Sequence, residues 1–338
     1  MPGLPLALTQ GDPAGIGPEL ALRAWLLRNE RALPAFAYVG DITHLAAVAE
    51  RFRLPVPMCA CDWPEVAGAF QAALPVIGHG HVVEAATGAP DSRWAAATIA
   101  SIAQAVRAAR HGHAAAVVTN PIAKSVLYAA GFAYPGHTEY LAHLAANGGV
   151  TPRPVMMLWS DELAVVPVTI HIPLREVPHQ LSTEAIVETG RIVAKGLRER
   201  FGIENPRLAL SGLNPHAGES GALGTEDAEI VAPAIAALRA LGIDASGPYP
   251  ADTMFHARAR AGYDVALAMY HDQALIPIKT IAFDEGVNVT LGLPFIRTSP
   301  DHGTAFDIAA RGVARPDSLC AALLLAARMA AASAPGQP

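Results

Sequence analysis

The chain is poor in charged and aromatic residues and contains only three cysteines. Charged residues make up 16% of its 338 residues and aromatic residues 6%, and no run of Lys or Arg is long enough to form a basic stripe. Binding to nucleic acid requires clustered positive charge, and the formal net charge is −6, so we expect no nucleic-acid partner. Cys59, Cys61 and Cys320 do not form the pattern of a disulfide framework, which predicts reduced thiols.

The sequence also lacks the features of secreted and membrane proteins. Its N-terminus has no basic region, and Asp12 interrupts the first short apolar stretch, so we expect no signal peptide. The longest apolar segment, 319–334, is split by Arg328 and is shorter than the roughly 18 to 20 residues that a membrane span needs. We therefore predict a cytoplasmic protein that does not bind membranes, with 319–334 as a buried helix.

What the sequence does contain is a high apolar content in alternating strand-length and helix-length segments. Hydrophobic residues make up 52% of the chain, enough for a large core, and at roughly 150 residues per domain the length suggests two domains. The alternation predicts a mainly parallel sheet with helices on both faces, the α/β class. The predicted strands are 4–9, 35–39, 114–119, 155–159, 164–170, 207–211 and 264–269. One predicted helix begins near Pro18. The other predicted helices span 93–110, 184–200, 227–241 and 319–334.

Three histidines follow apolar runs, at the edge of the sheet where proteins of this class bind ligands. His171 and His271 come directly after such a run, and His216 follows one through an Asn-Pro turn. Three neutral imidazoles with an open fourth position would make a catalytic site for Zn²⁺ or a similar divalent ion. Hydrogen-bonded loop histidines are the alternative interpretation. The three are far apart in sequence, so their spacing does not decide between the two.

Two carboxylates and two cations are further candidates for the site. Asp252 and Asp272 are candidates for orienting a metal-bound imidazole or water, although Asp252 alone fits a helix N-cap or turn equally well. Lys279 and Arg297 lie in apolar surroundings, where a cation can hold a substrate phosphate or carboxylate; a snorkelling or structurally paired side chain is the alternative. The segment 11–19, GDPAGIGPE, matches neither the GxGxxG nor the Walker A spacing, although its glycines permit a tight turn beside a ligand.

Longer motifs extend over nearly the whole chain. They are 11–19, 119–124, 136–139, 171–174, 214–219, 270–273 and 288–298. Several blocks of this length in one order are specific to a family. In these motifs the chain resembles the 4-hydroxythreonine-4-phosphate dehydrogenases, NAD-dependent enzymes of pyridoxal 5′-phosphate (vitamin B6) biosynthesis.

The resemblance implies roles for individual residues. His171, His216 and His271 match the metal ligands of the family, and one of them is contributed across the interface of a homodimer. The metal would be Zn, Mg or Co. The implied substrate contacts are His137, Thr138, Lys279, Asn288 and Arg297. The implied binding residues for NAD (or NADP) are His302, Gly303 and Thr304, in a loop over 301–305.

The resemblance also implies a fold and a reaction. The fold would be that of isocitrate and isopropylmalate dehydrogenases, with two α/β/α domains and the site in the cleft between them. We expect domain one, on the cofactor side, over 1–128 plus 290–338, and domain two, with the metal site and the dimer interface, over 129–289. The substrate would be 4-phosphooxy-L-threonine. Its oxidation and decarboxylation would give 3-amino-2-oxopropyl phosphate, with Asp252 or Lys279 assisting proton transfer.

Three other functions remain open from the sequence. The same chemistry could act on another acid, such as a phosphorylated threonate or a dihydrodiol dicarboxylate, which the cleft residues would not distinguish. An acyl-phosphate transferase is a further alternative, because phosphotransacetylases have a related fold. A non-catalytic metal-binding protein is disfavoured because the substrate-contact positions are intact.

Overall fold

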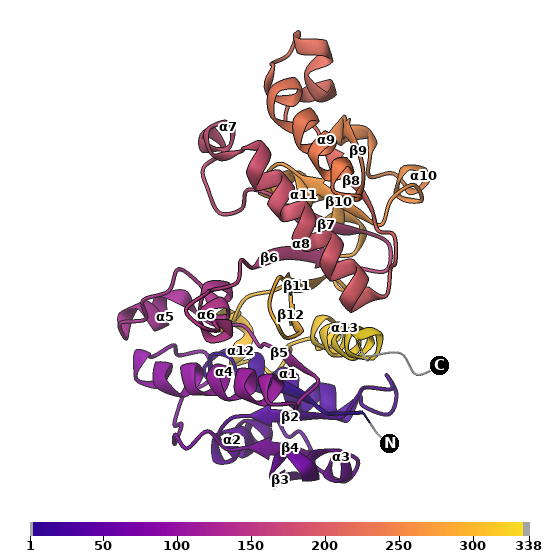
Figure 1. Cartoon of the computed structure of the whole chain (residues 1–338). Helices are drawn as coiled ribbons and strands as arrows, with labels where there is room; N and C mark the ends of the chain where they lie inside the picture. The colour runs from indigo at the N-terminus through magenta and orange to yellow at the C-terminus, as the bar shows by residue number, and fades with distance from the viewer. Residues whose placement is uncertain (1–2, 334–338) are drawn as a thin grey trace. The chain divides into compact units, whose positions relative to one another are not determined.

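The computed structural model describes residues 3–333, which form two compact units (Figure 1). Unit 1 contains 3–154 and 293–331, and unit 2 contains 155–292 and 332–333. The predicted α/β class is confirmed in both units. Residue 334, the end of the predicted C-terminal helix, lies outside the described residues. Within 3–333, every helix is too short or too polar to cross a membrane.

Unit 1 is built on strands in the order β3-β4-β2-β1-β5-β12, and every pairing resolved among them is parallel. The strands are β1 (Leu6–Thr9), β2 (Phe36–Val39), β3 (Met58–Ala60), β4 (Leu74–Ile77), β5 (Ala116–Val118) and β12 (Arg297–Pro300). The α-helices are α1 (Gly17–Leu26), α2 (Ile42–Arg51), α3 (Val66–Ala69), α4 (Ala95–Arg110), α5 (Lys124–Ala129), α6 (His137–Ala145), α12 (Phe306–Ala309) and α13 (Asp317–Ser333). The 3₁₀ turns are η1 (Trp63–Glu65) and η2 (Ser92–Trp94).

Both faces of this sheet are buried. Ala7 of β1 packs with Ile102 of α4 and Leu141 of α6 in one apolar core. Successive strand residues point to opposite faces, so Leu6 and Leu8 lie on the other side, and they are equally inaccessible. A parallel sheet needs helices on both faces, and unit 1 meets that requirement.

The observed division between the units falls at 154/155 and 292/293, whereas the sequence analysis expected boundaries at 128/129 and 289/290. The helix α6 belongs to unit 1 because Tyr140 and Leu141 pack into the unit 1 core. His137 and Thr138, at the start of α6, therefore lie in the same unit as Arg297.

Unit 2 has a mixed sheet in the order β11-β6-β7-β10-β8-β9. β7, β10, β8 and β9 are parallel, and β6 runs antiparallel to β7 and β11. The strands are β6 (Val155–Trp159), β7 (Ala164–Pro167), β8 (Arg207–Ser211), β9 (Asp244–Tyr249), β10 (Val265–Ala268) and β11 (Val287–Leu291). The α-helices are α7 (Val177–Gln180), α8 (Thr183–Phe201), α9 (Ala232–Ala240), α10 (Ala257–Arg260) and α11 (His271–Ile281). The shorter turns are η3 (Leu174–Glu176), η4 (Pro215–Gly221), the π turn η5 (Asp227–Val231) and η6 (Ala251–Thr253).

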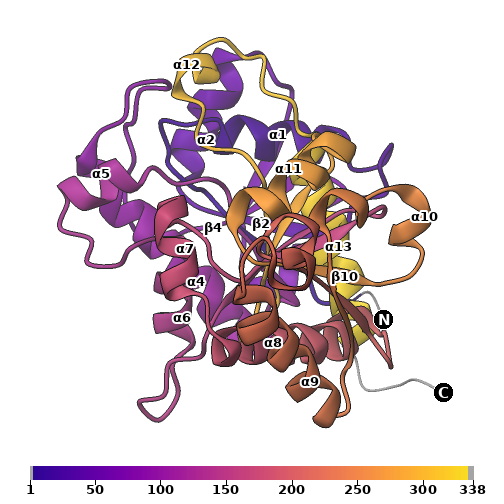
Figure 2. The same cartoon turned by 90° about the horizontal axis from the view of Figure 1, so that it is seen from above.

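The long helix α8 packs against β6 and β11 and lies beside α9 (Figures 1 and 2). Two glycines of α8 permit these close contacts. A Cβ at Gly190 would come within 2.8 Å of Leu238 in α9, and one at Gly196 within 2.8 Å of Leu291 in β11. The predicted helix over 227–241 is present without a break from 227 to 240: its first turn, η5, is π-helical, and α9 follows directly.

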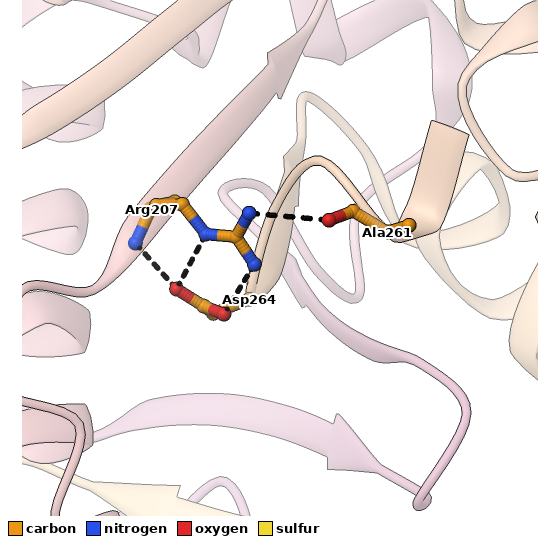
Figure 3. A network of polar contacts seen from close by, with 3 residues as sticks. All are labelled: Arg207, Ala261 and Asp264. Atoms are coloured by element: carbon orange, nitrogen blue, oxygen red, sulfur yellow. Dashed lines mark hydrogen bonds and ion pairs between the residues drawn. The ribbon is translucent and has the colours of Figure 1, made fainter. Parts of the chain in front are cut away.

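An ion-pair network fixes the amino ends of β8 and β10 (Figure 3). The N–H and Nε of Arg207 both donate to Oδ2 of Asp264, at 2.8 and 3.2 Å, and Nη2 donates to Oδ1 at 2.8 Å. Nη1 of Arg207 donates to the carbonyl of Ala261 at 3.1 Å. Because β8 and β10 pair directly, this network holds the register of two strands whose carboxyl ends lead to His216 and His271.

Candidate functional site

In unit 1, Arg297 is a buried cation held in one orientation. It begins β12, is 4% exposed, and donates from Nε and Nη2 to Oγ1 of Thr119, at 3.1 and 2.8 Å. Thr119 follows β5 and is itself fixed by its N–H, which donates to the carbonyl of Thr298 at 3.0 Å. Burial lowers the pKa of Arg297 to about 10, so the guanidinium remains charged at neutral pH. A fixed, buried guanidinium is suited to binding a phosphate or carboxylate.

His137, the first residue of α6, lies near Arg297. Burial, followed by the charge of Arg297, holds the pKa of His137 well below its ordinary value, so the imidazole is neutral at neutral pH. Its Nε2 is buried and makes no hydrogen bond to the described residues. A buried polar atom without a partner is costly, which makes this nitrogen a candidate ligand contact. Thr138 is the next residue of the same helix.

The predicted cofactor residues lie on a loop that contacts the segment 11–19, and that segment in turn contacts Gly88. The N–H of Ile16 donates to the carbonyl of Thr304 at 3.1 Å, and the N–H of Gly88 donates to the carbonyl of Ala14 at 2.7 Å. A Cβ at Gly15 would lie 3.0 Å from the Thr304 carbonyl oxygen, so the two loops approach closely. A Cβ at Gly303 would meet nothing within 4 Å, so the backbone there is open to a ligand. These features fit a dinucleotide held by backbone groups.

Asp12 adds a titratable group to this loop cluster. Its Oδ1 accepts the N–H of Ala14 at 3.0 Å, and the residue is 4% exposed. Burial raises the pKa of Asp12 to about 6, against the lowering effect of the Ala14 hydrogen bond. The sequence analysis named Asp12 as an interruption of an apolar stretch and included it in the motif 11–19, but gave its side chain no role.

In unit 2, His171 and His271 lie side by side. Their ring centroids are 5.6 Å apart. Nδ1 of His271 lies 2.7 Å from Oδ1 of Asp272. A carboxylate only accepts, so Nδ1 carries the proton and Nε2 is the nitrogen that can bind a metal. A carboxylate that orients an imidazole in this way is typical of metal-binding histidines, so the pair fits a divalent ion.

His216 is presented by an unusual backbone turn. From His216 to Ser220 every residue of η4 has a positive φ, a left-handed conformation that costs non-glycine residues about 1–2 kcal/mol each. The buried carboxylate of Asp227 holds the start of the turn. It accepts the N–H of Leu213 at 2.7 Å and that of Asn214 at 3.0 Å. Asp227 is thus a residue of the site region that the sequence analysis missed.

The three predicted metal ligands are not gathered into one group within a single chain. Among residues 3–333, no three His, Cys, Asp or Glu side chains form a set that could hold a metal ion. His171 and His216 are exposed and His271 is partly exposed, so all three can face another molecule. Asp252 is exposed on η6, which packs against the η4 turn that carries His216.

The last two predicted contacts lie elsewhere in unit 2. Lys279 is in the last turn of α11, the helix that begins with His271, and its Nζ lies 5.3 Å from the ring centroid of Phe283. Asn288 is on β11, paired with Leu158 of β6. α11 thus carries one predicted metal ligand at its start and one predicted substrate contact near its end.

The roles of some residues of the site region could not be predicted from the sequence. Thr119 accepts hydrogen bonds from Arg297, which is distant in sequence, and Asp227 accepts hydrogen bonds from backbone N–H groups. An acidic residue in the first turn of a helix, such as Asp227, is predicted only to favour the helix dipole. The motif containing Thr119 marks the position but not its partner.

Comparison with known proteins identifies the family. A curated protein of Methylorubrum populi named 4-hydroxythreonine-4-phosphate dehydrogenase is 64% identical over 96% of this chain and 94% of its own length. A crystal structure of the protein of that name from Klebsiella pneumoniae is 38% identical, covers 97% of this chain and 98% of that one, and has a TM-score of 0.86. The structure of a terephthalate 1,2-cis-dihydrodiol dehydrogenase from Burkholderia xenovorans is 28% identical, with a TM-score of 0.65 over 96% and 97% of the chains.

The sequence profile of one family matches residues 33–326, most of the chain. The similarity therefore includes both units and all the predicted metal and substrate residues. The chain belongs to the family described as pyridoxal phosphate biosynthetic protein PdxA.

Proposed function

We propose that this chain oxidises 4-phosphooxy-L-threonine with NAD⁺ to 2-amino-3-oxo-4-phosphooxybutanoate, which then loses carbon dioxide to give 3-amino-2-oxopropyl phosphate. The observation that carries the proposal is the identity of 64% to the Methylorubrum populi protein over nearly the full length of both chains. When bound, NAD⁺ would supply the acceptor for the hydride on the carbon that bears the substrate hydroxyl. NADP⁺ is the alternative acceptor.

The anionic end of the substrate is assigned to the buried cation of unit 1. Arg297 offers a charged fork held by Thr119, and the neutral His137 can hydrogen-bond to the same anion. A dianionic phosphate gains most from a buried, oriented guanidinium, because charge-assisted hydrogen bonds are stronger where water is excluded. Thr138, Lys279 and Asn288 are the other proposed substrate contacts.

His171, His216 and His271 are the proposed ligands of a Zn, Mg or Co ion. When bound, such an ion lowers the pKa of a coordinated hydroxyl and stabilises negative charge on its oxygen. Asp272 keeps the proton of His271 on Nδ1 and so holds its Nε2 ready for the ion. Asp252 and Lys279 are the proposed proton acceptors, and His302, Gly303 and Thr304 the proposed cofactor contacts.

A homodimer would complete the proposed metal site. The support is the exposure of the histidines together with that of apolar neighbours in the same unit: Leu174 is 69% exposed and Ile276 63%. Isolated apolar side chains on a surface are common, but these lie close in sequence to His171 and His271. Sedimentation of the wild type and of Ile276→Arg tests this, since a stable dimer should shift toward monomer in the variant.

The test of the reaction is the appearance of reduced nicotinamide, followed by absorbance, with purified protein, NAD⁺, a divalent ion and 4-phosphooxy-L-threonine. Reduction that depends on both the ion and the substrate is the expected result. Absence of reduction under conditions where NAD⁺ and the ion both bind would contradict the proposed substrate.

A second candidate is oxidation of a dihydrodiol dicarboxylate, favoured by the likeness to the Burkholderia xenovorans dehydrogenase. The same assay with such a diol, and with a phosphorylated threonate, separates the candidates by kcat/KM. We expect the phosphorylated amino acid to give the highest value, because the identity to the dihydrodiol enzyme is much lower.

A further inference from the structure

Two of the three histidine-bearing segments of unit 2 bond directly to one buried amide, Gln273, and the third reaches it through Met269. This residue lies in the first turn of α11, two positions after His271, and is 9% exposed. Its Oε1 accepts two hydrogen bonds, from Oγ of Ser211 and from the N–H of Met269, each at 2.7 Å. Its Nε2 donates to the carbonyl of Gly212 at 2.7 Å. One side chain thus joins α11 to the carboxyl ends of β8 and β10.

The three hydrogen bonds require an amide in a single orientation. The N–H of Met269 can only donate, and the carbonyl of Gly212 can only accept. An amide at position 273 satisfies both at once, whereas a carboxylate would lose the donated bond and methionine would lose all three. The network is also buried, since Ser211 and Met269 are inaccessible, so each lost bond would leave a polar group unsatisfied.

The carboxyl end of β7 is joined to this hydrogen-bond network through Met269. The carbonyl of Met269 accepts two bonds from Thr169, from Oγ1 at 2.7 Å and from N–H at 3.2 Å. Thr169 stands two residues before His171, and Gly212 stands four residues before His216. His216 and His271 are therefore a short stretch of backbone away from groups that Gln273 binds, and His171 is linked to Gln273 through Thr169 and Met269.

We propose that Gln273 is a positioning residue that sets the relative placement of the segments carrying His171, His216 and His271, and thereby the affinity of the site for a divalent cation. This rests on the metal ligands of the proposed function. Metal affinity depends on how well the ligands are held before the ion arrives, and outer groups that orient ligands typically change it 10- to 100-fold. Gln273 does not itself contact the ion.

The decisive variant is Gln273→Met, which keeps the size of the side chain and removes its hydrogen bonds. The full-length protein is titrated with Co²⁺, and its visible absorption reports both affinity and ligand geometry. We expect the affinity for Co²⁺ to fall about 10- to 100-fold and the absorption bands to shift. The matched control is Asp264→Asn, at the amino ends of the same strands, which should keep the wild-type affinity and bands while its thermal unfolding temperature falls.

Ser211→Ala is the milder variant and protects the test against poor folding of Gln273→Met. It removes one accepted bond of Gln273 and should reduce Co²⁺ affinity in the same direction by a smaller factor. Wild-type affinity and bands in Ser211→Ala and in any folded Gln273→Met, with lowered unfolding temperatures, would show a purely structural role and overturn the proposal.

His171→Ala separates this inference from the proposed function. Loss of Co²⁺ binding in His171→Ala, together with wild-type binding in Gln273→Met, would overturn only the positioning role. Wild-type binding in His171→Ala would overturn the metal site and the positioning role together.

Discussion

The two ends of β8 and β10 are held together by different chemistry. At the amino ends, Arg207 and Asp264 form an ion pair whose side chains are 43% and 21% exposed. At the carboxyl ends, Gln273 makes only neutral, buried hydrogen bonds. An ion pair near water avoids the full cost of desolvation, whereas the neutral hydrogen bonds of Gln273 join the carboxyl ends without adding a charge. We therefore expect the contacts at the amino ends to affect stability alone and those at the carboxyl ends to affect ligand binding.

The largest expected effect comes from His271→Ala, which removes a proposed metal ligand at the carboxyl end. Turnover should fall by roughly 10³-fold or more, because stabilisation of charge by the ion contributes several kcal/mol to the barrier. The unfolding temperature of the metal-free protein should change little, since His271 is partly exposed. Nicotinamide reduction and thermal unfolding are measured on the same preparation.

Full turnover of His271→Ala after chelation of all divalent ions would show that the reaction does not use this site. Asp272→Asn provides an intermediate comparison, because asparagine keeps an acceptor for Nδ1 of His271 but loses the charge.

Asp227→Ala should affect both stability and the site. The variant leaves the N–H groups of Leu213 and Asn214 without their acceptor in a partly buried loop. At about 1–3 kcal/mol for each of the two N–H groups, we expect the free energy of unfolding to fall by about 2–6 kcal/mol. Urea unfolding measures this loss, and Co²⁺ titration should show weaker binding because His216 is no longer held. A lowered free energy of unfolding with unchanged Co²⁺ affinity would show that this loop does not contribute to the metal site.

The smallest effect is expected for Asp264→Asn at the amino ends, and it should depend on pH. Burial would raise the pKa of Asp264, but its hydrogen bonds and ion pair with Arg207 outweigh burial and hold the pKa below its ordinary value. A depressed folded pKa stabilises the protein above the unfolded pKa, about 3.9, and this contribution is lost as the pH falls through the folded pKa.

At pH 7 the variant should therefore be about 0.5–1 kcal/mol less stable than the wild type, and the difference should shrink as the pH falls below about 4. Turnover at pH 7 should be unchanged. If the stability difference between the wild type and the variant stays constant across the acid range, the charge of the Asp264 carboxylate is not its cause.

The sequence was sufficient to predict the family and the α/β class. Family membership is confirmed by the profile match over 33–326 and by the Methylorubrum populi relative. These predictions succeeded because strand and helix periodicity and long motifs are local properties of the chain. The assignment of His171, His216 and His271 to a metal remains a prediction, since ligands so far apart in sequence give no spacing to test.

The remaining features depend on contacts between distant segments. Strand β12, Arg297–Pro300, has no apolar run, and it is buried because it pairs with β5. The segment 129–154 joins unit 1 through the packing of Tyr140 and Leu141, which no local pattern indicates. Gln273 reads as an ordinary helix residue until its partners across β8 and β10 are known.

The left-handed turn of η4 has a consequence for the dynamics of the protein. Four of its residues, His216, Ala217, Glu219 and Ser220, are non-glycine residues with positive φ, so the turn is supported mainly by its surroundings. Such segments open locally at a lower free energy than the strands beside them. The backbone amides of 216–220 should therefore exchange with solvent early, and an ion bound by His216 should slow that exchange. Hydrogen exchange at this turn would then report the occupancy of the site without any turnover.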